Sequence, residues 1–249
     1  MMSTDFSRLG KFSPEELDGF IREAARLLNP GERIAFLSKN FLNTDYAEAT
    51  LIGDKDTPEI FIINLHGVDC MTFIEYIEAM RRSGSYQEFE SNLRQVRYGS
   101  GIVEFANRNH FFTDWKQFNA QYVEDVSETI GGRKTVRVQK TLNLKEDGGH
   151  FLPGIQPVER EILYVPSEAV DARRLETGDY IGIYSALSGL DVSHAGILIR
   201  DGENLFLRHA SSRKKYRKVI DQDFSAYIAD KPGVTVFRPR QRKIPAKPE

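Results

Sequence analysis

The chain has 249 residues, of which 40% are hydrophobic and 28% are charged, and its formal net charge is −2. That length and composition are typical of a globular protein, and the small net charge gives no electrostatic reason to expect nucleic acid or an anionic membrane as a partner. The single cysteine excludes an intrachain disulfide and any zinc site that needs two thiolates from this chain.

Helices are predicted near the N-terminus, over about residues 13–41. Ser13-Pro14-Glu15-Glu16 combines a capping serine, a first-turn proline and a glutamate at the third position, which is typical of a helix start. The apolar face of this helix continues to Leu28, and Asn29-Pro30-Gly31 ends it. A second helix is predicted over residues 32–41.

The chain's only cysteine follows a predicted buried strand over residues 59–65. After Cys70, apolar residues such as Phe73 and Ile77 recur with helical spacing. Asp69 is placed to cap this helix, so Cys70 falls in its first turn. Unpaired N–H groups and the helix dipole favour a thiolate there, and the thiolate is the nucleophilic form. A buried structural thiol is the alternative.

Residues 86–98 are predicted to form another helix. Residues 99–149 are harder to assign because aromatic and polar groups are mixed in them. Within this stretch, the alternation in Thr135-Val136-Arg137-Val138-Gln139 predicts a strand. Residues 166–175 are predicted to form a short helix or turn.

The C-terminal part is predicted to be rich in strands. Asp201-Gly202 is a hairpin signal, and the strands expected in this region cover residues 180–184, 194–199, 205–209 and 234–238. Because helices dominate the first half of the chain and antiparallel strands the second, the predicted fold class is α+β.

His194 opens one strand of the predicted hairpin and His209 closes the next, so the turn brings the two imidazoles close together. A cysteine nucleophile needs a base to take its proton, and that base needs an orienting group on its other nitrogen. Cys70, His194 and His209 are candidates for these roles, with structural histidines as the alternative. A zinc site that adds His66 and Asp69 lacks the usual ligand spacing, so no metal or cofactor is predicted.

Four short motifs follow one another along the chain. They are Asp69-Cys70 at a helix start, Leu175-Glu176-Thr177-Gly178-Asp179-Tyr180-Ile181 at a strand start, Ser193-His194-Ala195-Gly196-Ile197, and His209-Ala210. In this order they resemble the NlpC-type papain-like cell-wall peptidases. The upstream segment 41–46 also looks like the Gly-Thr-Pro-Tyr element of that family, which implies that Tyr46 lies beside the nucleophile. The similarity covers roughly residues 40–82 and 172–212.

The chain departs from the family pattern near the cysteine. Met71-Thr72 stands in place of Ser-Gly, and Asn43 and Asp45 replace a glycine and a proline. The long interval between nucleophile and base, which contains residues 108–115, is most similar to the N-acetylmuramoyl-L-alanine amidase-like branch. That branch implies cleavage of the amide between muramic acid and the first alanine of the peptidoglycan stem. Other enzymes of the superfamily cut within the stem next to D-glutamate, and the departures leave this choice open.

The resemblance implies one catalytic domain over residues 1–249 with a papain-like fold. N-terminal helices and a nucleophile at a helix start would pack on a C-terminal antiparallel sheet or partial barrel, with residues 85–165 as a long insertion. The family implies the cell envelope or periplasm. No signal peptide is visible, so either it was removed or the protein is cytoplasmic. No apolar run approaches the ~20 residues of a membrane span, and no protein partner is indicated.

The resemblance also assigns roles at the site. Cys70 would attack an amide of peptidoglycan or a muropeptide, with His194 as the base and His209 as its orienting group. Tyr46 and Asp69 would lie at the oxyanion or substrate site.

Three residues of the insertion are further candidates for substrate binding. Arg108 could pair with a carboxylate, Trp115 could stack on a sugar, and Asp114 lies beside Trp115. The alternative is a satellite core beneath the insertion.

Two other classes of protein fit the same residues. A glycoside hydrolase would use two carboxylates, for which Glu75, Glu78, Glu104 and Asp114 are available, although glutamates on helices are usually solvated. A wall-binding module without catalysis would carry Cys70 as an inert thiol.

Overall fold

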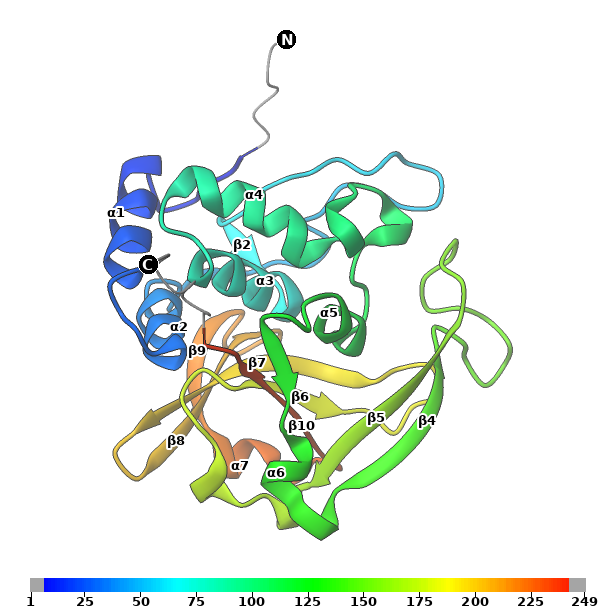
Figure 1. The fold of residues 1–249 in the computed structure, drawn as a ribbon. Helices are drawn as coiled ribbons and strands as arrows, with labels where there is room; N and C mark the ends of the chain where they lie inside the picture. The colour runs from blue at the N-terminus through cyan, green and yellow to red at the C-terminus, as the bar shows by residue number, and fades with distance from the viewer. Residues whose placement is uncertain (1–6, 242–249) are drawn as a thin grey trace, which may run out of the picture.

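The computed structural model describes residues 7–241, and its architecture confirms the α+β class. A layer of helices packs against a large mixed sheet (Figure 1). Residues 1–6, on which the expectation about a signal peptide depends, lie outside the described residues. Among the described helices, none has the length and apolar character needed to cross a membrane.

Four helices form most of the helical layer, and they begin where capping residues stand. Their bounds are α1 (Pro14–Ala24), α2 (Pro30–Lys39), α3 (Cys70–Arg81) and α4 (Tyr86–Arg97). Ser13 and Glu16 form the predicted capping box of α1, which ends before the predicted limit at Leu28. The Asn29 side chain accepts two N–H bonds at the start of α2, so this helix begins at Pro30.

The sheet runs in the order β2-β1-β9-β8-β7-β6-β10-β5-β4, and β3 pairs with β10. All its pairs are antiparallel except β1 with β2. The strands are β1 (Asp45–Tyr46), β2 (Gly67–Val68), β3 (Val123–Asp125), β4 (Val136–Leu142), β5 (Val158–Pro166), β6 (Tyr180–Tyr184), β7 (Val192–Asp201), β8 (Asn204–Ser211), β9 (Lys218–Asp223) and β10 (Gly233–Pro239). The predicted hairpin is β7–β8.

The predicted strand over residues 59–65 is wrong. The segment is largely buried, but its regular pairing is limited to isolated bridges at Ile60 and Asn64. Instead of a ladder, isolated backbone bonds to Arg8 and Ile52 and two side chains satisfy its backbone. Arg97 donates to the Ile62 carbonyl at 2.8 Å, and the Tyr76 hydroxyl accepts from Asn64 N–H at 2.9 Å. A short apolar run therefore indicated burial here but not strand geometry.

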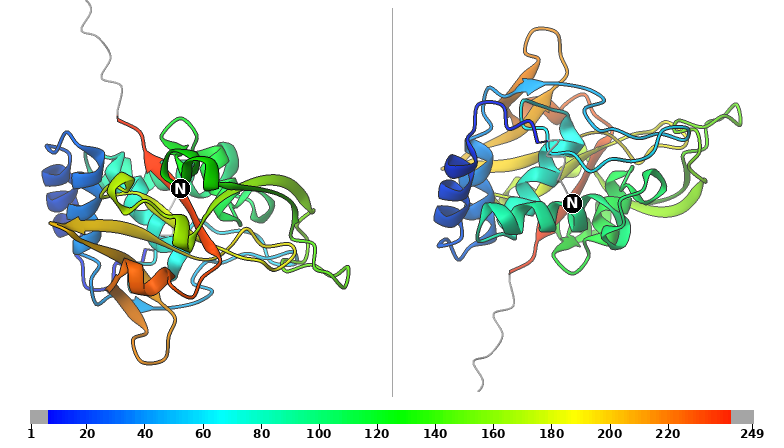
Figure 2. Two further views of the ribbon diagram at one scale, coloured as in Figure 1. Left: turned by 90° about the horizontal axis from the view of Figure 1, so that it is seen from below. Right: turned by 90° about the horizontal axis from the view of Figure 1, so that it is seen from above.

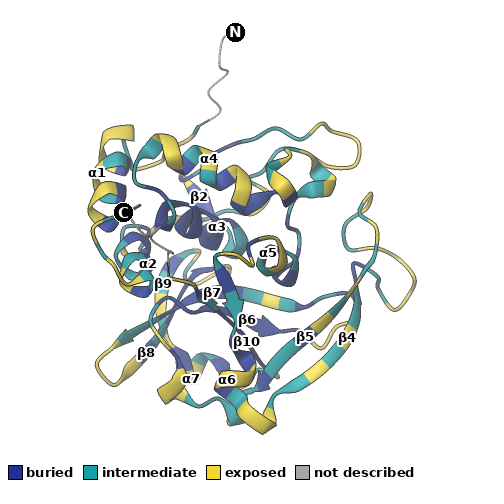
Figure 3. Cartoon of the chain, in the orientation of Figure 1, coloured by how far each residue is buried: buried dark blue, intermediate teal, exposed yellow. Residues whose placement is uncertain are grey.

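Helix α3 lies at the centre of the molecule, and Figure 3 shows it as almost wholly buried. It packs on one face of β7 and β8, where Ala195 and Ile197 join its core. On the opposite face, Leu198 and Leu207 pack against α7 (Phe224–Ile228). The β7–β8 hairpin is thus held between two helices, which fixes the position of its histidines.

Residues 85–165 contribute both helices and strands. Besides α4, β3, β4 and β5, they contain α5 (Phe112–Phe118), α6 (Ser127–Gly131) and the 3-10 turns η1 (Gly99–Gly101), η2 (Phe105–Asn107) and η3 (Gly132–Lys134). The strand predicted over residues 135–139 is part of β4. Figure 2 shows that β4, β5 and the loop joining them extend away from α1 and α2. Two further turns, η4 (Ser167–Ala169) and η5 (Ala172–Arg174), occupy the segment predicted as a short helix or turn.

Candidate active site

Cys70 is the first residue of α3, as the sequence predicts. Asp69 is the N-cap, and its carboxylate accepts the Thr72 backbone N–H at 2.7 Å. The Thr72 hydroxyl closes the capping box by accepting from the Asp69 N–H at 2.9 Å. The Asp69 side chain is therefore engaged in holding the helix start, and this sets the position of the thiol.

The predicted thiolate at Cys70 is not supported. Burial raises the pKa of the thiol to about 12, and the nearby charge of Asp69 acts in the same direction. The backbone N–H groups of Ala195, Cys70 and Met71 point at the sulfur and lower the pKa, but they do not offset the desolvation. Cys70 is therefore a neutral thiol at neutral pH, and it needs a base.

His194 and His209 contact each other directly, which confirms that the hairpin brings the imidazoles together. His194 Nε2 lies 2.7 Å from His209 Nδ1, and the two rings are nearly perpendicular. His209 lies two positions along the hairpin and on the same face as His194, because the register from Ile197 and Arg208 continues to place it opposite Gly196. A Cβ on Gly196 would lie 3.0 Å from the Cβ of His209, so glycine leaves room for this contact.

Both imidazoles are neutral at neutral pH. Burial lowers the pKa of His194 to about 3, and the charges of His209 and Arg213 contribute in the same direction. Burial also lowers the pKa of His209 to about 4, against a raising effect of its hydrogen bond to Gln222. Tyr227 of α7 covers the pair, with its ring centroid 5.0 Å from that of His209. The thiol and both imidazoles are therefore uncharged at neutral pH.

Cys70 and His194 line the same pocket, which has a volume of about 210 Å³. Its other walls are mainly apolar and come from α3, from residues 110–112 and 151–152, and from residues 190–195 around the start of β7. They are Met71, His110, Phe111, Phe112, Phe151, Leu152, Leu190, Asp191, Val192, Ser193 and Ala195. Asp191 is engaged within the wall, because its carboxylate accepts the Thr113 N–H at 2.7 Å and the Thr113 hydroxyl at 2.9 Å.

Tyr46 lies near Cys70, although it is not among the residues that line the pocket. β1 pairs in parallel with β2, which places Tyr46 beside Val68, just before the cysteine. Burial raises the pKa of Tyr46 to about 12, and the charges of Glu48 and Asp69 act in the same direction. Its hydroxyl therefore keeps its proton and can donate a hydrogen bond.

The structure does not bring Arg108, Asp114 or Trp115 into the pocket. Arg108 forms an ion pair with buried Glu59, in addition to hydrogen bonds to nearby carbonyls. Trp115 is fully buried and packs edge-on against Tyr180. The proposed sugar stacking is thus corrected, because no face of the indole is open.

Asp114 is likewise engaged, in an ion pair with Arg160 at 2.7 Å. Arg108 and Trp115 therefore hold their segment against Glu59 and Tyr180, whereas the Asp114 pair lies within residues 85–165. Phe111 and Phe112 of the same segment line the pocket instead.

The carboxylates considered for a glycoside hydrolase are also outside the pocket. The expectation of solvated glutamates is wrong for Glu75 and Glu78, which are buried in ion pairs with Arg97 and Arg81. Glu78 also accepts the Tyr180 hydroxyl at 2.7 Å. Glu104 accepts from the Asn107 side chain at 3.1 Å and lies on the surface.

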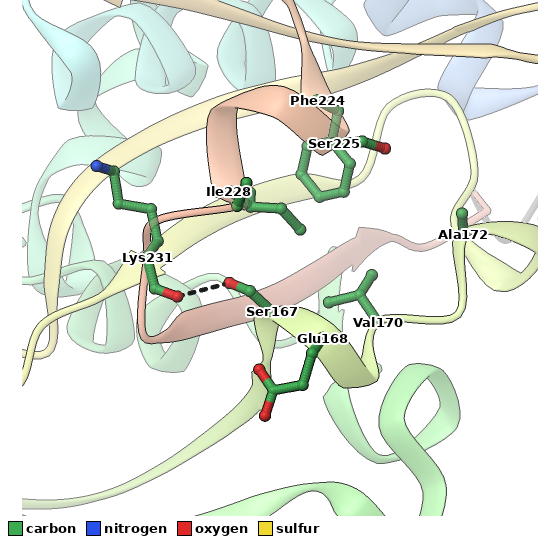
Figure 4. A pocket seen from close by; sticks show the side chains of 9 residues that line it. Ser167, Glu168, Val170, Ala172, Phe224, Ser225, Ile228 and Lys231 are labelled. Atoms are coloured by element: carbon green, nitrogen blue, oxygen red, sulfur yellow. Dashed lines mark hydrogen bonds between the residues drawn. The ribbon is translucent and has the colours of Figure 1, made fainter.

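The described residues contain no group of three His, Cys, Asp or Glu side chains that could hold a metal ion. A separate hollow of about 310 Å³ lies between α7 and η4, where Ser167 donates to the Lys231 carbonyl at 2.8 Å (Figure 4). Its lining includes neither a cysteine nor a histidine. The pocket at Cys70, in contrast, is lined by both a cysteine and a histidine.

Sequence reasoning missed several residues of this site. Gln222 contacts His209 from β9, Tyr227 covers the histidines, and Phe151 and Leu152 line the pocket from the loop between β4 and β5. The adjacent β-branched residues Val219 and Ile220 are a weak strand signal that could have indicated β9, although not the register that brings Gln222 to His209. The loop residues carry no comparable signal.

Comparison with known proteins gives a consistent picture. A model of the AmiA-like family, described as N-acetylmuramoyl-L-alanine amidase-like, matches residues 36–234. No curated protein matches the chain. Among solved structures, an N-acetylmuramoyl-L-alanine amidase from Bacteroides uniformis ATCC 8492 is 25% identical, with a TM-score of 0.71 over 85% of this chain and 99% of that one.

Two further structures share the fold. A putative xylanase from Bacteroides fragilis is 27% identical, with a TM-score of 0.64 over 81% of this chain and 98% of that one. Protein LPG0564 from Legionella pneumophila str. Philadelphia 1 is 20% identical, with a TM-score of 0.72 over 90% of this chain and 95% of that one. Since the family model covers well over half of its length, the chain belongs to the AmiA-like, N-acetylmuramoyl-L-alanine amidase-like family.

Proposed function

We propose that this protein is a cysteine-dependent amidase that hydrolyses peptidoglycan or muropeptides at the N-acetylmuramoyl-L-alanine bond. The observation that carries the proposal is the placement of Cys70 and His194 in one pocket, with His194 Nε2 held by His209. Because that contact occupies Nε2, His194 Nδ1 is the nitrogen left to take a proton. The family and the Bacteroides uniformis amidase support the reaction class.

A papain-like origin of the NlpC type belongs to the same proposal. A cysteine at the start of a buried helix, packed on an antiparallel hairpin that carries two histidines, is consistent with it. We further place residues 1–249 in one catalytic domain, with residues 85–165 as an insertion that builds part of the pocket wall. The peptidoglycan substrate puts the site of action in the cell envelope.

The first chemical step joins proton transfer to attack. His194 Nδ1 takes the thiol proton while the sulfur bonds to the amide carbonyl carbon, because burial disfavours a separated thiolate and imidazolium before substrate binds. The carbonyl π electrons move to oxygen and form a tetrahedral oxyanion. The Cys70 N–H at the helix start and the Tyr46 hydroxyl are the donors available to it.

The second half of the reaction returns the proton. The His194 imidazolium protonates the alanine nitrogen as the carbon–nitrogen bond breaks, leaving a thioester on Cys70. His194 then removes a proton from water, which attacks the thioester and releases a carboxylate. Cys70 regains its proton and the cycle closes.

The character of the pocket supports the muramoyl-alanine bond over a bond next to D-glutamate. Among the described residues that line it, neither lysine nor arginine occurs. A D-glutamate carboxylate would lose water there without gaining a cation, which is costly. Arg108, the cation considered for that role, is paired with Glu59. The lactyl and alanyl methyl groups that flank the proposed bond suit apolar walls.

Mass spectrometry of purified muropeptides after incubation with the protein tests the proposal. We expect a disaccharide with a free lactyl carboxylate and a stem peptide with a new alanine amino group. Cys70→Ala is the inactive control, and Thr50→Ala, a change outside the pocket lining, is the matched active control.

Other products would contradict the proposal in distinct ways. New reducing sugar ends would indicate a glycosidase, and a cut beside D-glutamate would indicate an endopeptidase. Unchanged muropeptides would indicate a wall-binding module. Equal product from the Cys70→Ala variant would exclude a cysteine nucleophile.

A further inference from the structure

A third polar side chain continues the contact between the two histidines. Gln222 Oε1 lies 2.8 Å from His209 Nε2, and His209 Nδ1 lies 2.7 Å from His194 Nε2. The three residues come from the adjacent strands β9, β8 and β7. Gln222 is opposite Leu207, two positions along β8 from His209, so the three side chains follow a diagonal across one face of the sheet.

The Gln222 amide oxygen, at the end of this series of hydrogen bonds, determines which nitrogen of each imidazole carries the hydrogen. An amide oxygen can only accept, so His209 Nε2 must carry the hydrogen. A neutral imidazole has one N–H, and His209 is neutral at neutral pH, so its Nδ1 accepts from His194 Nε2–H. His194 is also neutral, and its Nδ1 is then left with a lone pair.

We propose that Gln222 is a positioning residue that sets the tautomer of the base His194 through His209. Its effect on catalysis rests on the proposed amidase function, whereas the order of protons does not. Gln222 is not among the residues that line the pocket, and its side chain bonds to His209, so it acts through the two imidazoles.

The opposite arrangement shows what Gln222 prevents. If the amide turned so that its NH₂ group donated to His209 Nε2, His209 would carry its hydrogen on Nδ1. That hydrogen would point at His194 Nε2, and His194 would then carry its own hydrogen on Nδ1. A base in this form cannot take the thiol proton of Cys70.

The groups around Gln222 favour imidazoles that are uncharged, with the positions of their hydrogens set by hydrogen bonds. Asp221 is paired with Arg208 at 2.7 Å, and its charge is the smallest of the influences on the pKa of His209, which it raises. Arg213 disfavours a proton on either histidine, and Tyr227 covers both rings. Asp223 caps α7 by accepting the Ala226 N–H at 2.7 Å. A neutral amide therefore fixes the proton order while both imidazoles stay uncharged.

The tautomers can be read directly by ¹⁵N NMR of histidine-labelled protein, without substrate. In the wild-type protein we expect His194 and His209 to be neutral, each with its hydrogen on Nε2. Gln222→Met keeps the length of the side chain but removes the acceptor, so both tautomers should become populated. Gln222→Glu restores an oxygen acceptor and should restore the wild-type pattern.

Turnover of muropeptides by the same proteins gives the catalytic arm. Gln222→Met should lower kcat by about tenfold with little change in KM, since it reduces the fraction of competent base. Gln222→Glu should stay within about threefold of wild type, because the orienting bond remains. Gln139→Met, at a surface glutamine of β4, is the matched control and should leave both readouts unchanged.

Three results would overturn the inference: wild-type tautomers in Gln222→Met, unchanged kcat in that variant, or equal losses in the Met and Glu variants, which would indicate a structural role only. An inactive wild-type protein would contradict the proposed function instead. The NMR arm would then still decide the proton order.

Discussion

Two regions of this molecule bury titratable side chains, and they offset the cost of burial in different ways. In α3, Glu75 and Glu78 are buried as charges, and each is paired with an arginine. On the β7–β9 face, His194 and His209 are buried as neutral groups that pass hydrogen bonds from one to the next. In the first region each carboxylate is neutralised by an arginine. In the second region Nδ1 of His194 has no hydrogen-bond partner within the histidine pair and is free to accept a proton.

This difference indicates that the ion pairs contribute to stability and the histidines to catalysis. A buried ion pair already has its partners, so it holds elements together, and protonating its carboxylate would leave the arginine charge buried without a partner. A neutral imidazole chain that ends at a pocket retains that capacity. Buried carboxylates in the centre of the molecule are therefore poor candidates for catalysis here, although their residue type suggested it.

The largest effect is expected at the pocket end of the histidine chain. His194→Ala should lower muropeptide turnover by roughly 10³-fold or more, because the thiol of Cys70 then has no base. Thermal unfolding should show that the variant remains folded. His66→Ala, an exposed histidine, is the control. Activity within tenfold of wild type would remove His194 from the mechanism.

Breaking a buried ion pair should lower the free energy of unfolding rather than the rate of turnover. Arg97→Met leaves the Glu75 carboxylate buried without its cation, which should cost about 3–5 kcal/mol of unfolding free energy. Urea denaturation measures this loss, and adding Glu75→Gln should recover part of it. Arg22→Met breaks an exposed pair with Asp18 and should have little effect. Equal losses in the two arginine variants would contradict the distinction.

Tyr46→Phe should sharpen the description of the pocket. Loss of one oxyanion donor should lower kcat by about 10²-fold, with KM and stability nearly unchanged. Tyr216→Phe, on the surface before β9, is the matched control. A change confined to KM would instead place the Tyr46 hydroxyl in ground-state binding of the substrate.

The smallest effect is a dependence of stability on pH. The pKa values of His194 and His209 fall from 6.5 to about 3 and about 4 on folding, so between these limits the unfolded chain binds more protons. Stability contributed by the neutral imidazoles is therefore lost as the pH falls below about 6.5.

Burial raises the pKa values of Asp179 and Asp191, which acts in the opposite direction. The informative quantity is thus the difference between the wild type and His209→Gln. The variant should lose less stability between pH 6.5 and pH 4 when melting temperatures are compared. A steeper loss in the variant would contradict a neutral buried pair.

Much of the scaffold of the site was predictable from local sequence. Capping residues predicted the start of α3 at Cys70, and the Asp201-Gly202 turn predicted the hairpin that brings His194 and His209 together. These features depend on neighbours in the chain, so a single sequence contains them. The α+β class followed from the order of helices and strands.

The remaining features depend on partners that are distant in the sequence. Trp115 is buried by Tyr180, and the charge of Arg108 is taken by Glu59, so neither side chain is free for substrate. The pKa of Cys70 depends on how fully the surrounding protein desolvates the sulfur, which helix position alone does not reveal. Gln222 was missed because only the β8–β9 register brings it to His209.

The central claim is that Cys70 is the nucleophile and that His194 activates it. Its most direct test is the initial rate of stem-peptide release from a defined muropeptide by Cys70→Ser, measured beside the wild type. The serine hydroxyl nearly preserves the shape of the site but is a far weaker nucleophile than sulfur, so we expect a loss of several orders of magnitude. Release at a near-wild-type rate would contradict the account.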